Sequence, residues 1–332
     1  MKRILTLFLT LALILSLCSC AAPGEKADDG RLQIVATLFP YYDFARAIAG
    51  DRADVTLLLS PGREAHSFEP TPLDAVTISE ADVFLYNGGE GEYWVEEMLD
   101  AAGEHIAVKA RMMDYVDALG EEFSEGMQGA DEHGHDHDHD DHDHDHEEDE
   151  HDSDKVEYDE HIWTSPKNAA ILCRAVCEAI CRADAENADF YRANCDDYCA
   201  QIEALDARFA DLCESAHRKL LIFADRFPML YFCREYGLDY RAAFHGCSGD
   251  TEPSLATIKF LIDKVEDENI PVVYTIDFGT KKVAAVVSEC TGAAIETIYS
   301  MQTVSRADFD AGATYLTLME RNYEALRKGL NE

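Results

Sequence analysis

The chain has 332 residues, of which 47% are hydrophobic, and its formal net charge is −38 at pH 7. Such an acidic excess disfavours nucleic acid and anionic membrane surfaces as partners. The length is enough for about two domains of roughly 100–150 residues each. We therefore expect an acidic protein of two folded parts that attracts cations.

The first 20 residues have the features of a bacterial lipoprotein signal. Two basic residues precede Ile4–Leu17, an apolar stretch of 14 residues that is short for a membrane span. Leu-Cys-Ser-Cys follows and resembles a lipobox, with lipid on Cys20 and a polar tether over 21–30. These features predict an extracytoplasmic protein that its lipid anchors to the bacterial cell membrane.

Strand and helix patterns alternate along the next part of the chain. The predicted strands are Gln33–Phe39, Asp54–Leu59, Asp82–Tyr86 and His105–Val108. The predicted helices are Tyr42–Ala49, Pro72–Glu80 and Glu92–Ala102. This alternation is typical of an α/β lobe with a parallel sheet, and we assign the N-terminal lobe to residues 31–166.

Residues 131–154, within that lobe, contain 14 carboxylates and 8 histidines but no lysine, arginine or apolar side chain. Such a segment cannot bury enough apolar surface to order itself, so we expect a disordered loop. Imidazole suits zinc and similar ions, which a merely solvated charge run would not explain. We predict metal capture by its histidines, which are His133, His135, His137, His139, His142, His144, His146 and His151.

Residues 167–218 carry the clearest helical periodicity. Apolar residues recur at spacings of 4, 3, 4, 3, 4 and 3: Tyr191, Cys195, Tyr198, Ile202, Leu205, Phe209 and Leu212. This seam predicts one helix over Asn187–Ala216, roughly 45 Å long at 1.5 Å per residue. A coiled coil is the alternative, but a strut packed across both lobes is simpler.

Cysteines also recur at helical spacing in this region. Cys173, Cys177 and Cys181 are four residues apart, and so are Cys195 and Cys199. A thiolate metal site is one interpretation, but no CxxC pair occurs and cysteine is a common buried residue, so we favour core packing. Nine cysteines remain after the leader and its lipidated residue, and we expect no disulfide framework.

The C-terminal part, residues 219–332, repeats the α/β pattern. Its predicted strands are Leu220–Ala224, Tyr240–Phe244, Val272–Ile276 and Ile295–Tyr299. Its predicted helices are Pro228–Tyr236, Leu255–Val265, Lys281–Cys290 and Gly312–Leu330. The predicted fold is therefore two α/β lobes with parallel sheets, joined by one long rigid helix, with a cleft between the lobes.

Several motifs support a family resemblance. They are GREAHSFEPTP at 62–72, DEHIWTSP at 159–166, YFCREYGL at 231–238, TEPS at 251–254 and VVYTIDFGTKKVAAVVSECTG at 272–292. Through them the whole mature chain resembles the metal-binding lipoproteins of ABC-type zinc and manganese importers. The resemblance implies that the chain captures Zn²⁺ and delivers it to an ABC permease. The chain has no GxxxxGK[ST] motif, so the ATPase is expected on another chain.

The resemblance also implies a set of metal ligands. The histidines of its first two motifs map onto His66 and His161. Where the family has a third histidine, this chain has Arg226, which cannot bind zinc. Asp225 or His245 could take that place, and both remain open. The family's acid after the VVYT strand maps onto Asp277.

Zinc is favoured over Mn²⁺ because imidazole suits zinc, whereas manganese prefers carboxylate and water. One rival interpretation is a zinc-dependent hydrolase, against which stands the lack of an HExxH pair. Another is a stand-alone metal-sequestering or adhesive surface lipoprotein. We expect a monomer that is not an enzyme.

Overall fold

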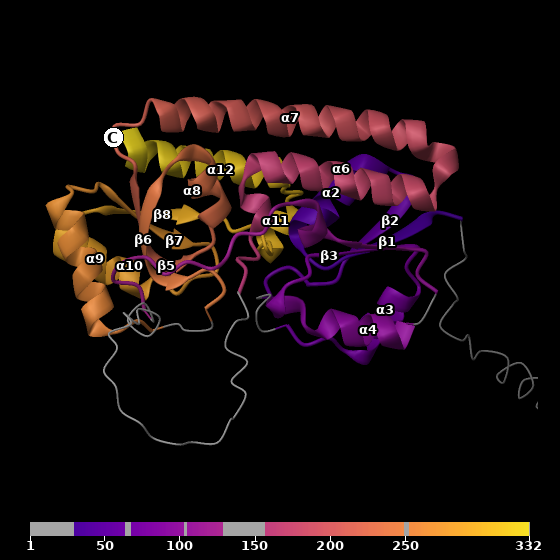
Figure 1. Cartoon of the computed structure of the whole chain (residues 1–332), viewed down its shortest axis with the longest axis horizontal. Helices are drawn as coiled ribbons and strands as arrows, with labels where there is room; N and C mark the ends of the chain where they lie inside the picture. Colours follow the sequence, from indigo (N-terminus) through magenta and orange to yellow (C-terminus); the bar gives the residue numbers. More distant parts are fainter. Residues whose placement is uncertain (1–29, 64–67, 103–104, 129–156, 249–251, 332) are drawn as a thin grey trace, which may run out of the picture. The chain divides into compact units, whose positions relative to one another are not determined.

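The computed structural model describes residues 30–63, 68–102, 105–128, 157–248 and 252–331. Leu32–Glu332 form one compact unit that contains two four-stranded sheets (Figure 1). The predicted fold of two α/β lobes is confirmed. The predicted leader with Cys20, the ligand His66 and the histidine-rich loop lie outside the described residues.

The N-terminal sheet has the order β2-β1-β3-β4, and all neighbouring strands are parallel. Its strands are β1 (Leu32–Ala36), β2 (Ala53–Leu57), β3 (Val83–Tyr86) and β4 (Val108–Arg111). The helices of this lobe are α2 (Phe39–Ala49), α3 (Pro72–Ser79) and α4 (Trp94–Ala102), with short 3-10 turns η1 (Glu90–Glu92) and η2 (Met112–Tyr115). Parallel neighbours require such crossover helices, which cover the faces of the sheet.

Two elements of this lobe differ from prediction. Strand β4 begins at Val108, where the predicted strand ends. Only Ala110 of its four residues is buried, so the sequence shows no apolar run there. Helix α2 begins at Phe39, inside the predicted first strand, because Pro40 suits the first turn of a helix.

The C-terminal sheet has the order β6-β5-β7-β8 and is also parallel throughout. Its strands are β5 (Leu220–Phe227), β6 (Asp239–His245), β7 (Val272–Ile276) and β8 (Ala294–Ile298). Its helices are α8 (Leu230–Tyr236), α9 (Leu255–Asp267), α10 (Lys282–Thr291), α11 (Arg306–Asp310) and α12 (Tyr315–Asn331). The two sheets therefore share one topology, in which the strand order reverses beside the first strand.

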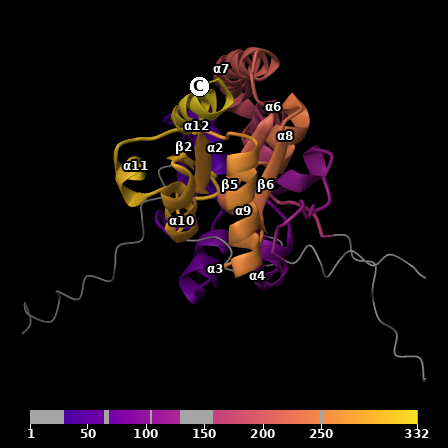
Figure 2. The same cartoon turned by 90° about the vertical axis from the view of Figure 1, so that its left-hand side faces the viewer.

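Helices α6 (Pro166–Ala183) and α7 (Ala188–Glu214) link the lobes, with a 3-10 turn η4 (Ala185–Asn187) between them. Helix α7 packs against α6 and α2 over the N-terminal lobe and against α8 and α12 over the C-terminal lobe (Figures 1 and 2). All seven residues of the predicted seam are buried. The predicted strut across both lobes is thus confirmed.

A continuous hydrophobic core runs through both lobes, from Ile34 in β1 to Tyr274 in β7. The cysteines of the described residues are free thiols, and most of them are buried in this core. This agrees with the expectation of buried thiols without a disulfide framework. In the described part of the chain, no helix combines the length and apolarity that a membrane span requires.

Candidate metal centre

Residues 159–164, here called the bridging segment, lie between the two sheets. Asn87, which follows β3, donates from Nδ2 to a main-chain carbonyl of this segment at 3.0 Å, and the Tyr231 hydroxyl donates to another at 2.8 Å. In return, the Trp163 indole donates to the Ser300 carbonyl at 2.8 Å. Both lobes therefore hold the bridging segment near the carboxyl ends of their strands, where α/β folds bind ligands.

His161 is the central side chain of the bridging segment and is 2% exposed. Its Nδ1 lies 3.2 Å from Asp159 Oδ1, and its main-chain N–H donates to the same oxygen at 2.8 Å. Burial alone would lower the pKa of His161, but the negative charges of Asp159, Glu121 and Glu160 outweigh burial and raise it. A carboxylate that holds one ring nitrogen is the usual support of a metal-binding histidine, whose other nitrogen binds the ion.

His245 ends β6 and lies close to His161. A Cβ added to Gly246 would be only 3.1 Å from His161 Cε1, so the chain after His245 rests against the His161 ring. The His245 Nδ1 is 3.6 Å from Glu121 Oε1 and makes no hydrogen bond among the described residues. The Cys247 N–H donates to the same Glu121 oxygen at 3.3 Å.

Glu121 is therefore a carboxylate in contact with His245, and the charge of His161 also acts on it. Burial opposes its ionisation, but the contacts with His245 and Cys247 outweigh burial and lower its pKa. Burial and the nearby acids raise the pKa of the Cys247 thiol well above its ordinary value. Sequence reasoning missed both residues. Cys247 stood two positions from a candidate histidine, whereas Glu121 lies in a loop without any motif.

Asp225 has a different place, in the irregular part of β5 where the pairing with β6 shifts register. Its Oδ2 accepts from Thr275 Oγ1 at 2.6 Å and from the Ile276 N–H at 3.3 Å. Its Oδ1 accepts from the Arg226 N–H at 2.9 Å. Oδ2 therefore stabilises the contact of β5 with β7, Oδ1 bonds to the main chain of β5, and Asp225 is largely committed to the sheet.

Asp277 directly follows β7. Its Oδ1 accepts from the Ser300 N–H at 3.3 Å. Burial raises its pKa to about 6, although hydrogen bonds such as that of Ser300 oppose this effect. Because the Ser300 carbonyl also binds Trp163, a single residue links Asp277 to the bridging segment.

The structure thus brings some of the candidate ligands closer together than others. Within the described residues, no three ligand atoms of the set His161, His245, Asp225 and Asp277 lie within 4.8 Å of one another.

The chain is held in place on both sides of residues 64–67, which the structure does not describe. Gly62 donates its N–H to the Val304 carbonyl at 2.8 Å, and Phe68 packs on Trp94 with ring centroids 5.3 Å apart.

Two more buried acids are Glu160, within the bridging segment, and Glu92 in η1. Glu160 Oε1 accepts from the Gly91 N–H at 2.7 Å, and burial raises the pKa of Glu160. Glu92 Oε2 accepts from the Gly88 N–H at 2.8 Å. Burial raises the pKa of Glu92 to about 7. The carboxylate that favours a cation beside the candidate ligands is therefore Asp159, which holds His161.

Two α/β lobes linked by one long helix, with histidines and carboxylates where the sheets meet, are the construction of a metal-binding solute-binding protein. A family model described as zinc-uptake complex component A, periplasmic, matches residues 34–329, and the chain belongs to this family.

Individual relatives agree. The chain is 31% identical to the high-affinity zinc uptake system protein ZnuA of Bacillus subtilis over 98% of its own length and 97% of that protein. It is 29% identical to the zinc-binding lipoprotein AdcA of Streptococcus pneumoniae over 99% of its own length, but it spans only 61% of AdcA. The crystal structure of the Zn(II)-bound ZnuA-like domain of that AdcA has a TM-score of 0.71 at 25% identity, covering 91% of this chain and 100% of that one. The predicted family is confirmed, and a binding protein is favoured over a zinc hydrolase.

Proposed function

We propose that this protein is the extracytoplasmic solute-binding subunit of a metal ABC importer. It captures Zn²⁺ between its lobes and delivers the ion to a membrane permease that a separate ATPase drives. The observation that carries the proposal is that the buried His161 ring lies against the residue after His245, whose own ring is 3.6 Å from the Glu121 carboxylate, in a zinc-uptake family member. Two imidazoles favour zinc over manganese as the cargo.

The proposed cargo ligands are His66, His161, Asp277 and His245. We prefer His245 to Asp225 because both oxygens of Asp225 accept hydrogen bonds, whereas the His245 ring faces Glu121 through Nδ1 and would bind the ion through its other nitrogen. Glu121 would then orient His245 as Asp159 orients His161, and its negative charge would offset that of the cation.

Cargo binding should weaken as the pH falls. A zinc ligand must be deprotonated, so a proton competes with the ion at each of these groups. The pKa of His161 is raised and that of Asp277 is raised to about 6. Both groups bind a proton below their raised pKa values, so the affinity for zinc is highest above neutral pH and falls progressively through pH 7 to 5.

The N-terminal lipid and the histidine-rich loop complete the proposal. Lipid on Cys20 would hold the protein at the outer face of the cell membrane, near its permease. The loop at 131–154 would raise the local zinc concentration through its eight histidines. Neither segment contributes to the ligand set of the cleft.

The test is competition titration with a zinc chelator on protein that lacks residues 131–154, so that loop histidines do not contribute. His66→Ala and His161→Ala should each abolish the high-affinity site, because each removes one of four ligands. Asp277→Ala should weaken binding severely. His217→Ala, which alters an exposed histidine, is the matched control and should leave affinity unchanged.

The remaining pair of variants tests which residue supplies the third ligand in place of the family histidine that Arg226 replaces. His245→Ala should be severe and Asp225→Ala mild. The reverse result would transfer the ligand role to Asp225, and two mild results would indicate three protein ligands with water. Tight binding that survives His66→Ala and His161→Ala together would refute the proposed cleft site.

A further inference from the structure

Five thiols line the contact between α6 and α7, outside the metal centre described above. Three lie on α6 and two on α7, at intervals of four residues, which places them on one face of each helix. They are Cys173, Cys177, Cys181, Cys195 and Cys199. The two helices form a hairpin (Figure 1), and sulfur atoms from both helices lie within 4.8 Å of one another.

Three of the sulfurs converge closely enough to share an ion. The Sγ atoms of Cys173, Cys195 and Cys199 all lie within 4.8 Å of one another, the only such trio of candidate ligands among the described residues. The Sγ atoms of Cys195 and Cys199 are 3.9 Å apart. Zinc–sulfur bonds of about 2.3 Å in a tetrahedron put two sulfurs about 3.8 Å apart. The thiols therefore have nearly the spacing that metal binding requires.

A fourth thiol is within reach. Cys177 contacts Cys195 across the helix pair, so Cys195 has three thiol neighbours. Arg174 lies beside these thiols on α6, and its guanidinium is paired with Asp196 and Glu203.

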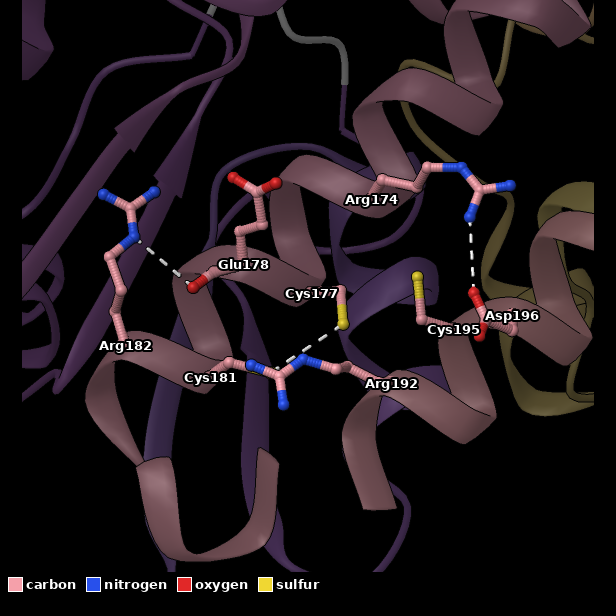
Figure 3. A pocket seen from close by; sticks show the side chains of 8 residues that line it. All are labelled: Arg174, Cys177, Glu178, Cys181, Arg182, Arg192, Cys195 and Asp196. Carbon is pink, nitrogen blue, oxygen red and sulfur yellow. Dashed lines mark hydrogen bonds and ion pairs between the residues drawn. The ribbon is translucent and has the colours of Figure 1, made fainter. Parts of the chain in front are cut away.

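The site also has an entrance. A surface cavity of about 510 Å³ is lined by Cys177, Cys181, Cys195 and Arg174, among other residues. Figure 3 shows the sulfurs of Cys177 and Cys195 pointing into the space between the two helices. Cys173 and Cys199 are fully buried behind them, so an ion could enter past the outer thiols.

Core packing of small apolar side chains accounts for the burial of these residues but not for their mutual contacts. As thiols, several of them donate to main-chain carbonyls, for example Cys195 to Cys173 at 3.8 Å and Cys199 to Ala170 at 3.7 Å. These weak hydrogen bonds leave the sulfur lone pairs available. A metal would replace the thiol protons, which pass to water, and no redox step is needed.

We propose that the α6–α7 thiols form a second metal site, independent of the cargo site, for a thiolate-seeking d¹⁰ ion such as Zn²⁺ or Cu⁺. Its ligands are Cys173, Cys195 and Cys199, completed by Cys177. Soft thiolates select these ions, and a closed shell of thiolates is typical of a structural site rather than of transported cargo. The ion would fasten α6 to α7 and so stiffen the strut between the lobes.

The experiment titrates Cd²⁺, and separately Cu⁺, into the reduced full-length mature protein. Thiolate-to-metal charge-transfer absorption in the ultraviolet is the readout, because imidazole and carboxylate ligands of the cargo site do not produce it. We expect saturation at one ion with a sulfur shell, and complete loss of the absorption in Cys195→Ala. Cys213→Ala removes a buried thiol of α7 outside the cluster and should change nothing.

Comparing the two ions shows how many thiolates bind the metal. Cys177→Ala should weaken Cd²⁺ on the order of 100-fold, while Cu⁺, which needs fewer thiolates, should bind with little change. X-ray absorption of Cd²⁺-loaded wild-type protein covers the case in which Cys195→Ala fails to fold, and it should report sulfur neighbours. Wild-type protein without charge-transfer absorption, or a Cys195→Ala variant that retains it, would show that the cluster is core packing alone. The cargo-site variants leave this readout untouched, so the two proposals fail separately.

Discussion

Replacing the buried Glu92 with Gln should make the protein more stable at alkaline pH. Glu92 lies in η1, where burial raises its pKa to about 7 although contacts with Thr37 and the Gly88 N–H oppose this effect. The carboxyl therefore favours its neutral form in the folded chain. Glutamine keeps the shape and the acceptor for Gly88 but carries no charge at any pH.

The expected gain follows from the shift in pKa. A rise from 4.5 to about 7 corresponds to about 3 kcal/mol at 1.36 kcal/mol per unit. Because the folded pKa is raised, the folded state holds the proton more tightly than the unfolded state does. The stability that this carboxyl contributes is complete below pH 4.5 and is lost as the pH rises through 7.

Urea unfolding of metal-free protein at pH 4.5, 6 and 8 tests this expectation. The free energy of unfolding of Glu92→Gln should exceed that of wild type by about 3 kcal/mol at pH 8, and this difference should shrink towards zero at pH 4.5. Glu96→Gln on the exposed face of α4 is the control and should follow wild type throughout. A difference that is absent, or that does not change with pH, would refute the claim that Glu92 is held neutral by burial.

Three further predictions concern other parts of the chain. Phe209→Ala in α7 should cost about 3–5 kcal/mol in urea unfolding, since the buried ring packs 4.9 Å from that of Phe232; a loss below about 1 kcal/mol would contradict a rigid strut. Deleting residues 131–154 should leave one tight zinc site and lower the total number of bound ions in calorimetry, and loss of all tight binding would make the loop the primary site. Cys20→Ala should release the protein from the membrane, as fractionation would show, with unchanged zinc affinity; retention would mean that another residue carries the lipid.

Much of the candidate site lay beyond sequence reasoning, and the physical reason is that its parts are distant along the chain. His161 stood out in a motif, but Glu121 did not. Glu121 acquires a role only because β6 brings the His245 ring to its carboxylate oxygen. The choice between His245 and Asp225 likewise depended on the irregular end of β5, where the carboxylate turns towards β7. No local pattern encodes that hydrogen bond.

The amino-acid sequence by itself determined what repeats locally. The seam of α7 follows the 3.6-residue period of a helix, and runs of β-branched residues marked most buried strands, so both could be predicted. Prediction from the sequence was wrong at β4, because the charged Lys109 and Arg111 interrupt any apolar pattern. Pairing with β3, rather than hydrophobicity, specifies that strand.

Tertiary structure alone decided which side chains meet. The cysteine spacing predicted one face on each of two helices, and burial of those faces was correctly expected. Only the packing of α6 against α7 brought the sulfurs of Cys173, Cys195 and Cys199 within 4.8 Å. Side-chain convergence depends on the crossing and relative shift of two helices, which the core as a whole fixes and neither helix specifies.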